Sequence, residues 1–247
     1  MEAVRVRPPC RVQNLTSMEN KITFISEMVF IEGGNFLIGN DIDNTSFPVR
    51  NVTVKDFYLG KYPVTQALWE AIMGNNPSHF KRNEMLPVES VSWDDAQAFI
   101  TKLNEKTGLN YRLPSETEWE YAARGGKYHA TGFMYAGSNN LDEVGWYNGN
   151  SGGETKLVGL KRPNQLGLYD MSGNVWEWCE DDWHESYTDS IMPTGSLAWI
   201  DHPRSIFRVM RGGCWDFSPQ FCRPAFRDDG RPDFRDCNLG FRLATSF

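Results

Sequence analysis

The sequence predicts an α+β fold with few regular elements and much irregular structure. Three observations predict it. Short strand patterns occur between residues 28 and 60, three capped helix patterns follow between residues 65 and 124, and residues 127–247 show neither a strong helix nor an internal repeat. This last region is rich in Gly, Asn, Asp, Pro and Trp. We expect it to be held by packing and specific polar contacts rather than by regular ladders.

The strand patterns come first in the chain. Apolar residues alternate with smaller or polar ones in MVFIEGGNFLIG, residues 28–39, which predicts two short strands around the turn Gly33-Gly34. The same alternation in NVTVKDFYLGKYPVT, residues 51–65, predicts another strand pair.

Each of the three helix patterns has a recognisable start. Thr65 is a suitable N-cap for QALWEAIM, residues 66–73. Ser92 precedes a segment with two acids in its first turn, and Gly108 is a natural stop for that helix. Ser115 and Glu118 have the spacing of a capping box, which predicts a third helix beginning after Ser115.

Composition indicates one soluble domain, residues 27–247, behind a leader of residues 1–26 that we expect to be disordered. No Ser/Gly/Pro run, charge block or low-complexity tract divides the chain of 247 residues. The net charge of -7, without a basic stripe, argues against nucleic-acid binding. No stretch approaches the ~20 apolar residues of a transmembrane segment. Residues 1–9 lack the apolar region of a signal peptide.

Six blocks, in order along the chain, carry a resemblance to a known family. They are MVFIEGGNFLIG, KYPVTQALWEAIMGNNPS, PVESVSWDDAQAFITKLNEKTG, YRLPSETEWEYAARGG, NQLGLYDMSGNVWEW and RVMRGGCWDF…CRPAFR…GFRLA. Together they resemble the formylglycine-generating-enzyme (sulfatase-modifying factor) family from about Met28 to Ala244. The resemblance implies a C-type-lectin-like fold. It does not imply activity, because function belongs to sites rather than folds.

Enzymes of that family are understood to oxidise a substrate cysteine with a copper-binding cysteine pair. Counted along GGCWDFSPQFC, residues 212–222, the two positions of the pair fall on Phe217 and Cys222. Phenylalanine offers no thiolate, so a two-coordinate copper(I) site cannot form there. Cys214 is an alternative partner only if its side chain re-aims toward Cys222. We interpret Cys222 instead as a small buried apolar side chain.

The C-terminal forty or so residues combine two sets of positions. The frame residues look like fixed anchors and comprise Arg211, Gly212, Gly213, Trp215, Cys222, Arg223, Ala225, Arg227, Arg231, Pro232, Arg235, Gly240, Phe241 and Arg242. Between them lie the interleaved residues, which follow neither a helix nor a strand period: Asp216, Phe217, Ser218, Phe221, Phe226, Asp228, Asp229, Gly230, Asp233, Phe234, Asp236, Cys237 and Asn238. Cys214 joins the interleaved residues in the predicted ligand-binding set.

The interleaved residues resemble the variable region of proteins diversified by retroelements. Such elements alter template adenines, and an asparagine codon AAC then yields Phe, Asp, Gly, Cys, Ser, Tyr or Asn, among others, but not Lys, Glu, Gln, Met or Trp. The interleaved residues all belong to the accessible set. We therefore expect a binding face whose phenylalanines supply contact area and whose carboxylates supply orientation. The alternative is a surface loop whose phenylalanines belong to the core.

Two acidic segments are candidates for metal binding. The resemblance implies a structural calcium ion held by side-chain oxygens at Asp170 and Glu177 and by carbonyls at Gly173 and Val175, donors that calcium accepts. In the alternative, Asp170 caps a turn and Glu177 pairs with an arginine of the tail. The run Glu180-Asp181-Asp182 is interpreted as a solvated face rather than a metal cluster.

The sequence thus predicts a non-enzymatic binding protein that requires no cofactor and engages varied protein or cell-surface partners. A cell-surface or extracellular location is expected from that function. The alternatives are a copper-dependent oxidase acting on a sulfatase cysteine, and a peptide-binding accessory domain.

Overall fold

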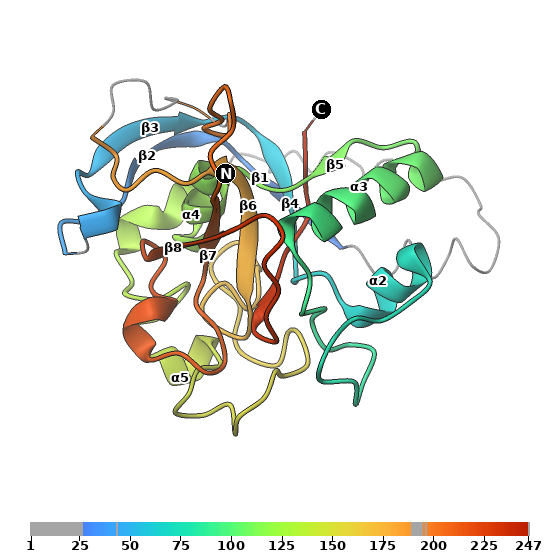
Figure 1. Ribbon diagram of the computed structural model, residues 1–247. Helices are drawn as coiled ribbons and strands as arrows, with labels where there is room; N and C mark the ends of the chain where they lie inside the picture. Colours follow the sequence, from blue (N-terminus) through green and yellow to red (C-terminus); the bar gives the residue numbers. More distant parts are fainter. Residues whose placement is uncertain (1–26, 43, 189–194, 196, 247) are drawn as a thin grey trace, which may run out of the picture.

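The computed structural model describes residues 27–42, 44–188, 195 and 197–246, so the predicted leader and Cys10 lie outside the described residues. Three sheets form the framework (Figure 1). In the first, β1 (Met28–Ile31), β4 (Phe57–Gly60), β10 (Ala244–Thr245) and β5 (Tyr111–Arg112) lie in that order. The second pairs β2 (Gly34–Ile38) with β3 (Arg50–Val54). The α+β prediction is confirmed.

The strands around Gly33 form, but they do not pair with each other. Antiparallel partners of β1 and β2 are β4 and β3, respectively. Gly34 belongs to β2 rather than to the turn. A Cβ on Gly33 would lie 2.3 Å from the carbonyl oxygen of Val54, so glycine is required where the chain crosses from one sheet to the other.

The three helices begin where the sequence predicts. The Thr65 hydroxyl accepts from the amide of Leu68 at the start of α2 (Gln66–Met73). Both Ser92, before α3 (Trp93–Thr107), and Ser115, before α4 (Glu116–Ala123), form complete capping boxes. Beyond α4 the helical elements are short, with one or two turns each: η2 (Gly126–Thr131), α5 (Leu141–Val144) and η3 (Pro219–Cys222). A further short turn, η1 (Asn44–Ser46), lies between β2 and β3.

A third sheet lies within the region that the sequence predicts to be irregular. Its strand order is β8 (Arg227–Gly230), β7 (Arg208–Arg211), β6 (Trp176–Asp182) and β9 (Leu239–Gly240). Six of the seven residues of β6 are buried, so both faces of this strand are covered. Because a doubly covered strand shows no alternation of apolar and polar residues, periodicity does not reveal it.

Two apolar clusters pack on either side of β6. In Figure 1, β2, β3 and α4 lie to one side of β6, and α2 and α3 lie to the other. Trp119 and Tyr121 of α4 pack in the first, with β2, β3 and β4. Residues of α2 and α3 pack in the second with Trp176 and Trp178 of β6. Among the described residues, no helix has the length and apolar character needed to span a bilayer.

Candidate ligand-binding face

Buried arginines of the frame attach the C-terminal segment to α4. Arg227 forms a two-point ion pair with Glu116, with Nε–Oε1 and Nη2–Oε2 distances of 2.5 and 2.9 Å. Arg211 pairs with Glu120, and its Nε lies 3.3 Å from Glu116. Burial alone would raise the pKa of Glu116, but the charges of Arg227 and Arg211 lower it below its usual value. Glu116 is therefore an ionised anchor for β8, and Glu116 and Glu120 of α4 together hold Arg211 of β7.

A third buried pair attaches the chain end to β6. Nε and Nη2 of Arg242 each lie 2.6 Å from an oxygen of Glu177, and the indole of Trp119 donates to the same carboxylate at 2.6 Å. Arg242 also donates to the carbonyls of Gly60 and Tyr169. This guanidinium is consequently bonded in several directions, which fixes its position.

Two frame glycines form the turn after β7. Gly212 and Gly213 have φ angles of 100° and 70°, in the left-handed region that favours glycine. A Cβ on Gly213 would lie 2.8 Å from both Cys222 Sγ and the Phe221 carbonyl oxygen. The turn can therefore bring residues 214–222 against β7 only with glycine at this position.

Two other frame arginines lie on the surface. Arg235 is half exposed and pairs with Asp95, with Nε–Oδ2 at 2.6 Å. The side chain of Arg231 is 69% exposed, and among the described residues its one ion pair is with Asp233, at 3.9 Å. The interpretation of Arg231 as an anchor is therefore wrong in this structure.

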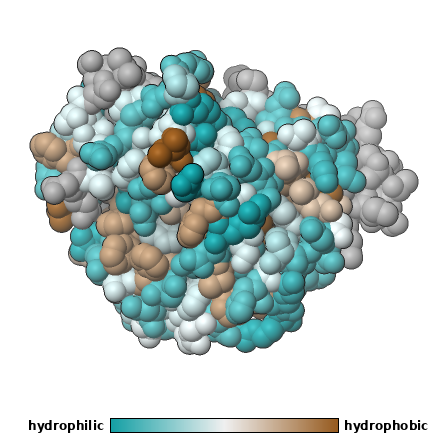
Figure 2. All heavy atoms as spheres, in the orientation of Figure 1, coloured by the Kyte–Doolittle hydropathy of each residue, from teal (hydrophilic) through white to brown (hydrophobic). Residues whose placement is uncertain are grey.

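Most interleaved residues reach the surface. Those that are exposed or partly buried are Asp216, Phe217, Ser218, Phe221, Phe226, Asp228, Asp229, Asp233, Phe234, Asp236 and Cys237. Figure 2 shows apolar side chains scattered among hydrophilic ones on the face that presents β8 and η3. The predicted ligand-binding residues are thus distributed over one continuous part of the chain, and most of them have accessible atoms.

Three predicted binding residues are directed inward instead. Cys214 and Asn238 are 0% and 7% exposed, and Gly230 is buried. A Cβ on Gly230 would lie 2.7 Å from the Trp178 ring, so this glycine permits close packing of β8 on the core. In this conformation Cys214, Gly230 and Asn238 support the face rather than contact a ligand.

Three phenylalanines form an aromatic cluster with Trp176 of β6. The ring centroids of Phe217 and Phe221 are 5.2 Å apart, and those of Phe221 and Phe226 are 4.8 Å apart, both edge-on. Trp176 contacts Phe217 and Phe226 beneath them. All three phenylalanines are partly buried against the core, whereas Phe234 stands apart and is 45% exposed. The predicted exposed binding face and the alternative of core phenylalanines are therefore both partly correct. One side of the cluster packs on the core, and the other side is accessible.

Carboxylates lie close to these phenylalanines along the chain. Asp216 is exposed and accepts from Asn238 Nδ2 at 3.1 Å and from Cys214 Sγ at 3.0 Å. Asp228 and Asp229 lie on β8, and burial raises the pKa of both. The charge of Asp229 raises the pKa of Asp228 further. The face thus combines aromatic area with acidic groups.

The thiols near Phe217 are placed unfavourably for copper(I) chemistry. Cys214 and Cys222 are both free and fully buried. Burial raises the pKa of the Cys222 thiol to about 12 and that of Cys214 well above its usual value. Because the thiolate is the metal ligand and nucleophile, both groups are held in the unreactive form. Phe217 stands at the first position of the cysteine pair that the family resemblance implies.

The predicted calcium set does not fit a cation as it is arranged. Both oxygens of Glu177 are bonded to the Arg242 guanidinium, which matches the alternative of a pair with a tail arginine. Asp170 accepts from the amide of Gly159 at 2.8 Å and from Asn174 Nδ2 at 3.4 Å. Gly173 and Val175 are buried in the same segment. The described part of the chain contains no group of three or more His, Cys, Asp and Glu side chains placed to hold a metal ion.

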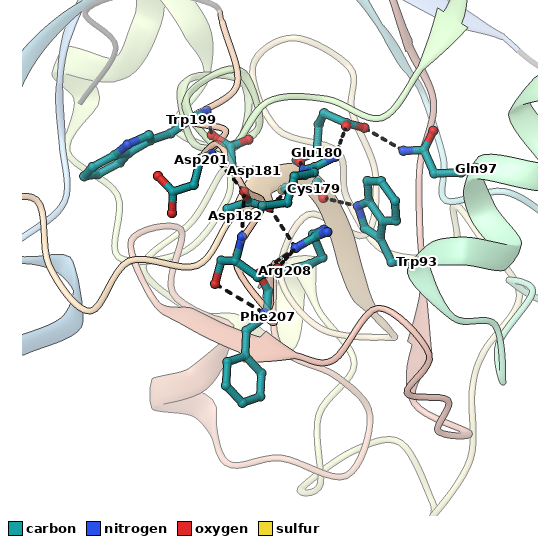
Figure 3. Close-up of polar contacts among 12 residues, drawn as sticks. Trp93, Gln97, Cys179, Glu180, Asp181, Asp182, Trp199, Asp201, Phe207 and Arg208 are labelled. Carbon is teal, nitrogen blue, oxygen red and sulfur yellow. Dashed lines mark hydrogen bonds and ion pairs between the residues drawn. The ribbon is translucent and has the colours of Figure 1, made fainter. Parts of the chain in front are cut away.

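The acid run of β6 is buried, so its interpretation as a solvated face is wrong. Asp181 and Asp182 are 3% and 1% exposed. Figure 3 shows Asp182 beside Arg208, whose Nη1 lies 2.8 Å from Oδ1. Asp181 accepts from the amides of Trp199 and Glu116. Burial, with the charge of Glu116, raises the pKa of Asp181 well above its usual value. These acids hold loops together because backbone amides and two arginines, Arg204 and Arg208, satisfy their oxygens.

The chain matches one known protein family over most of its length. A family model described as the sulfatase-modifying factor enzyme 1-like domain matches residues 14–247. The chain therefore belongs to that family. It is 35% identical over 249 residues to a protein named chaperone protein LppX from Paenibacillus barcinonensis, covering 81% of this chain and 82% of that protein.

Two further comparisons bear on the site. The chain is 34% identical over 201 residues to the formylglycine-generating enzyme of Mus musculus, covering 74% of this chain and only 50% of that enzyme. The solved structure of Treponema denticola variable protein 1 matches with a TM-score of 0.79 and 32% identity, covering 88% of this chain and 94% of that one. The fold is thus shared by an enzyme and by a variable protein.

Proposed function

We propose that this protein binds ligands without catalysing a reaction, and that a retroelement diversifies its interleaved residues so that they engage varied protein or cell-surface partners. The observation that carries the proposal is the contrast between the two sets of positions. Arg211, Arg227 and Arg242 of the frame are buried and paired with glutamates, while most interleaved residues have accessible atoms. Side chains at the surface can vary at small cost in stability, whereas the buried pairs cannot.

The composition of the face suits a protein partner. Phe217, Phe221 and Phe226 offer aromatic area that is already packed on one side, so little side-chain entropy is lost on binding. The carboxylates of Asp216, Asp228 and Asp229 add groups that orient a partner. A location at the cell surface or outside the cell follows from such partners and forms part of the proposal.

The similarity to a variable protein supports the genetic part of the proposal. Sequencing of the flanking DNA tests it. We expect a reverse-transcriptase gene and a near-copy of the 3′ end of this gene that differs only where the template has adenine. Absence of any such copy removes the basis for diversification, while leaving binding by the present residues to be tested by itself.

A copper-dependent oxidase is the second candidate, favoured by the identity to formylglycine-generating enzymes. It would require Cys222 to act with a partner other than residue 217. Incubation with copper(I), oxygen and a sulfatase-derived cysteine peptide tests it by mass spectrometry. We expect no formylglycine, since both buried thiols are protonated at neutral pH. Oxidation that disappears in C222S would establish the oxidase instead.

A further inference from the structure

A pocket of about 200 Å³ lies beside the proposed binding face. Ile42, Phe133 and Met134 form an apolar wall, and the segment Pro224-Ala225 closes another side. Ile42 and Met134 are 75% and 49% exposed, so the wall is open to solvent. The volume suits one side chain with a small polar group rather than a whole cofactor.

Two arginines line this apolar pocket. Arg124 donates to Glu120 at 2.8 Å, but Glu120 also accepts hydrogen bonds from Arg211 and from the amide of Gly39. One carboxylate is thus shared between two guanidinium groups, which leaves an excess of positive charge. The chain as a whole has a net charge of -7, so the charge of this pocket is opposite in sign to that of the protein.

Arg223 is the second arginine, and its charge has no acidic partner among the described residues. Its Nε is buried without a hydrogen-bond acceptor there, and the neighbouring polar group is the Tyr135 hydroxyl. A buried donor left unpaired costs free energy, which an acceptor brought by a ligand would recover. A carboxylate is the acceptor that matches a guanidinium best, since it takes two parallel hydrogen bonds.

We propose that this pocket binds a carboxylate carried next to an apolar side chain, as at the C-terminus or a glutamate of a peptide. The arginines would bond the carboxylate, and Ile42, Phe133 and Met134 would cover the apolar side chain. None of the lining residues belongs to the interleaved set, so the pocket stays constant while the adjoining face varies. The proposal does not depend on the diversified face, and either can fail without the other.

Three N-acetylated tripeptides test the pocket by calorimetric titration at low salt. Ac-Gly-Gly-Phe with a free carboxylate and Ac-Gly-Glu-Phe-amide represent the two sources of the carboxylate, and Ac-Gly-Gly-Phe-amide is the neutral control. We expect at least one carboxylate peptide to bind about tenfold or more tightly than the neutral amide. We also expect its binding to shift the methyl resonance of Met134. Equal affinity for the three peptides, or no binding of either acid at millimolar concentration, overturns the proposal.

Two variants and a matched control locate the binding. R223Q should reduce the preference for the acid peptide about tenfold, while R231Q, which removes an exposed arginine outside the pocket, should leave it unchanged. If R223Q does not fold, M134D places a negative charge on the exposed wall and should abolish binding of the acid peptide by repulsion. An undiminished preference in folded R223Q or M134D contradicts the proposal.

Discussion

Arg242 and Glu177 form a fully buried two-point ion pair that joins the end of the chain to the first residues of β6. The pair also occupies the carboxylate that the family resemblance assigns to calcium. A calcium ion at this position would therefore have to replace Arg242 as the partner of the Glu177 carboxylate.

Removal of either charge of this pair should destabilise the domain strongly. R242Q or E177Q leaves a buried charge uncompensated, and we expect a loss of about 3–5 kcal/mol in the free energy of unfolding measured with urea. R235Q breaks the surface pair with Asp95 and should cost less than about 1 kcal/mol. Equal effects of R242Q and R235Q would show that the buried pair is not an anchor.

Calcium should not change the stability of the protein. Because Glu177 is bonded to Arg242, a cation at Asp170 and Glu177 would have to displace a guanidinium. We expect the same unfolding temperature in calcium chloride and in EGTA. A rise with calcium that is absent in D170N would instead show that calcium binds at the positions that the resemblance implies.

Frame and interleaved positions should differ in their tolerance of substitution. G213A places a Cβ in a left-handed backbone conformation and against Cys222, and should cost about 2 kcal/mol or more. F221Y adds a hydroxyl to a partly exposed ring and should change stability by less than about 0.5 kcal/mol. Thermal unfolding of both variants measures the difference, which the proposed division of the tail requires.

The dependence of stability on pH should weaken when Asp228 is replaced by Asn. Burial raises the pKa of Asp228 in the folded state, so the native protein binds its proton more tightly than the unfolded chain does. This group therefore contributes stability below its ordinary pKa, and the contribution is lost as the pH rises through the raised value. D228N should be less stable than, or equal to, the parent at low pH and gain relative stability toward neutrality. A constant difference across urea titrations from pH 4 to pH 8 contradicts this.

Thiol labelling should distinguish the cysteines. Cys179, Cys214 and Cys222 are buried, whereas Cys237 is partly exposed. With iodoacetamide at pH 8 and peptide mapping, we expect Cys237 to be alkylated first among these four, although burial raises its pKa to about 11 and slows the reaction. The buried three should react only after addition of denaturant. Rapid labelling of Cys222 in the native protein would indicate an accessible thiol, as an oxidase needs.

Local signals made the helices predictable, and the absence of local signals concealed the third sheet. Thr65, Ser92 and Ser115 cap helices through contacts three residues away, which sequence spacing reveals. In contrast, β6 is covered on both faces and pairs with strands far away in the sequence. The sequence pattern also suggested that β1 and β2 pair with each other. They do not, because the chain leaves the first sheet at Gly33 and enters the second.

The candidate site was predictable in its chemistry more than in its placement. The division of the tail into anchors and interleaved residues comes from residue types, and burial of Arg211, Arg227 and Arg242 agrees with it. No pattern shows that Gly230 packs on Trp178 or that Cys214 is directed inward, because those contacts depend on tertiary structure. The burial of Asp181 and Asp182 was missed for the same reason, since their partners are backbone amides and two arginines that are distant in the sequence.

The position of β10 has a consequence for incomplete chains. Residues 244–245 lie between β4 and β5, so within the described structure they alone join the two halves of the first sheet. A polypeptide that stops within residues 211–240 also lacks Arg242, the counterion of Glu177. Such a product loses the strand that connects two parts of the sheet and leaves a bare carboxylate inside the core. We therefore expect prematurely ended copies to be degraded as unfolded chains rather than to persist with a damaged binding surface.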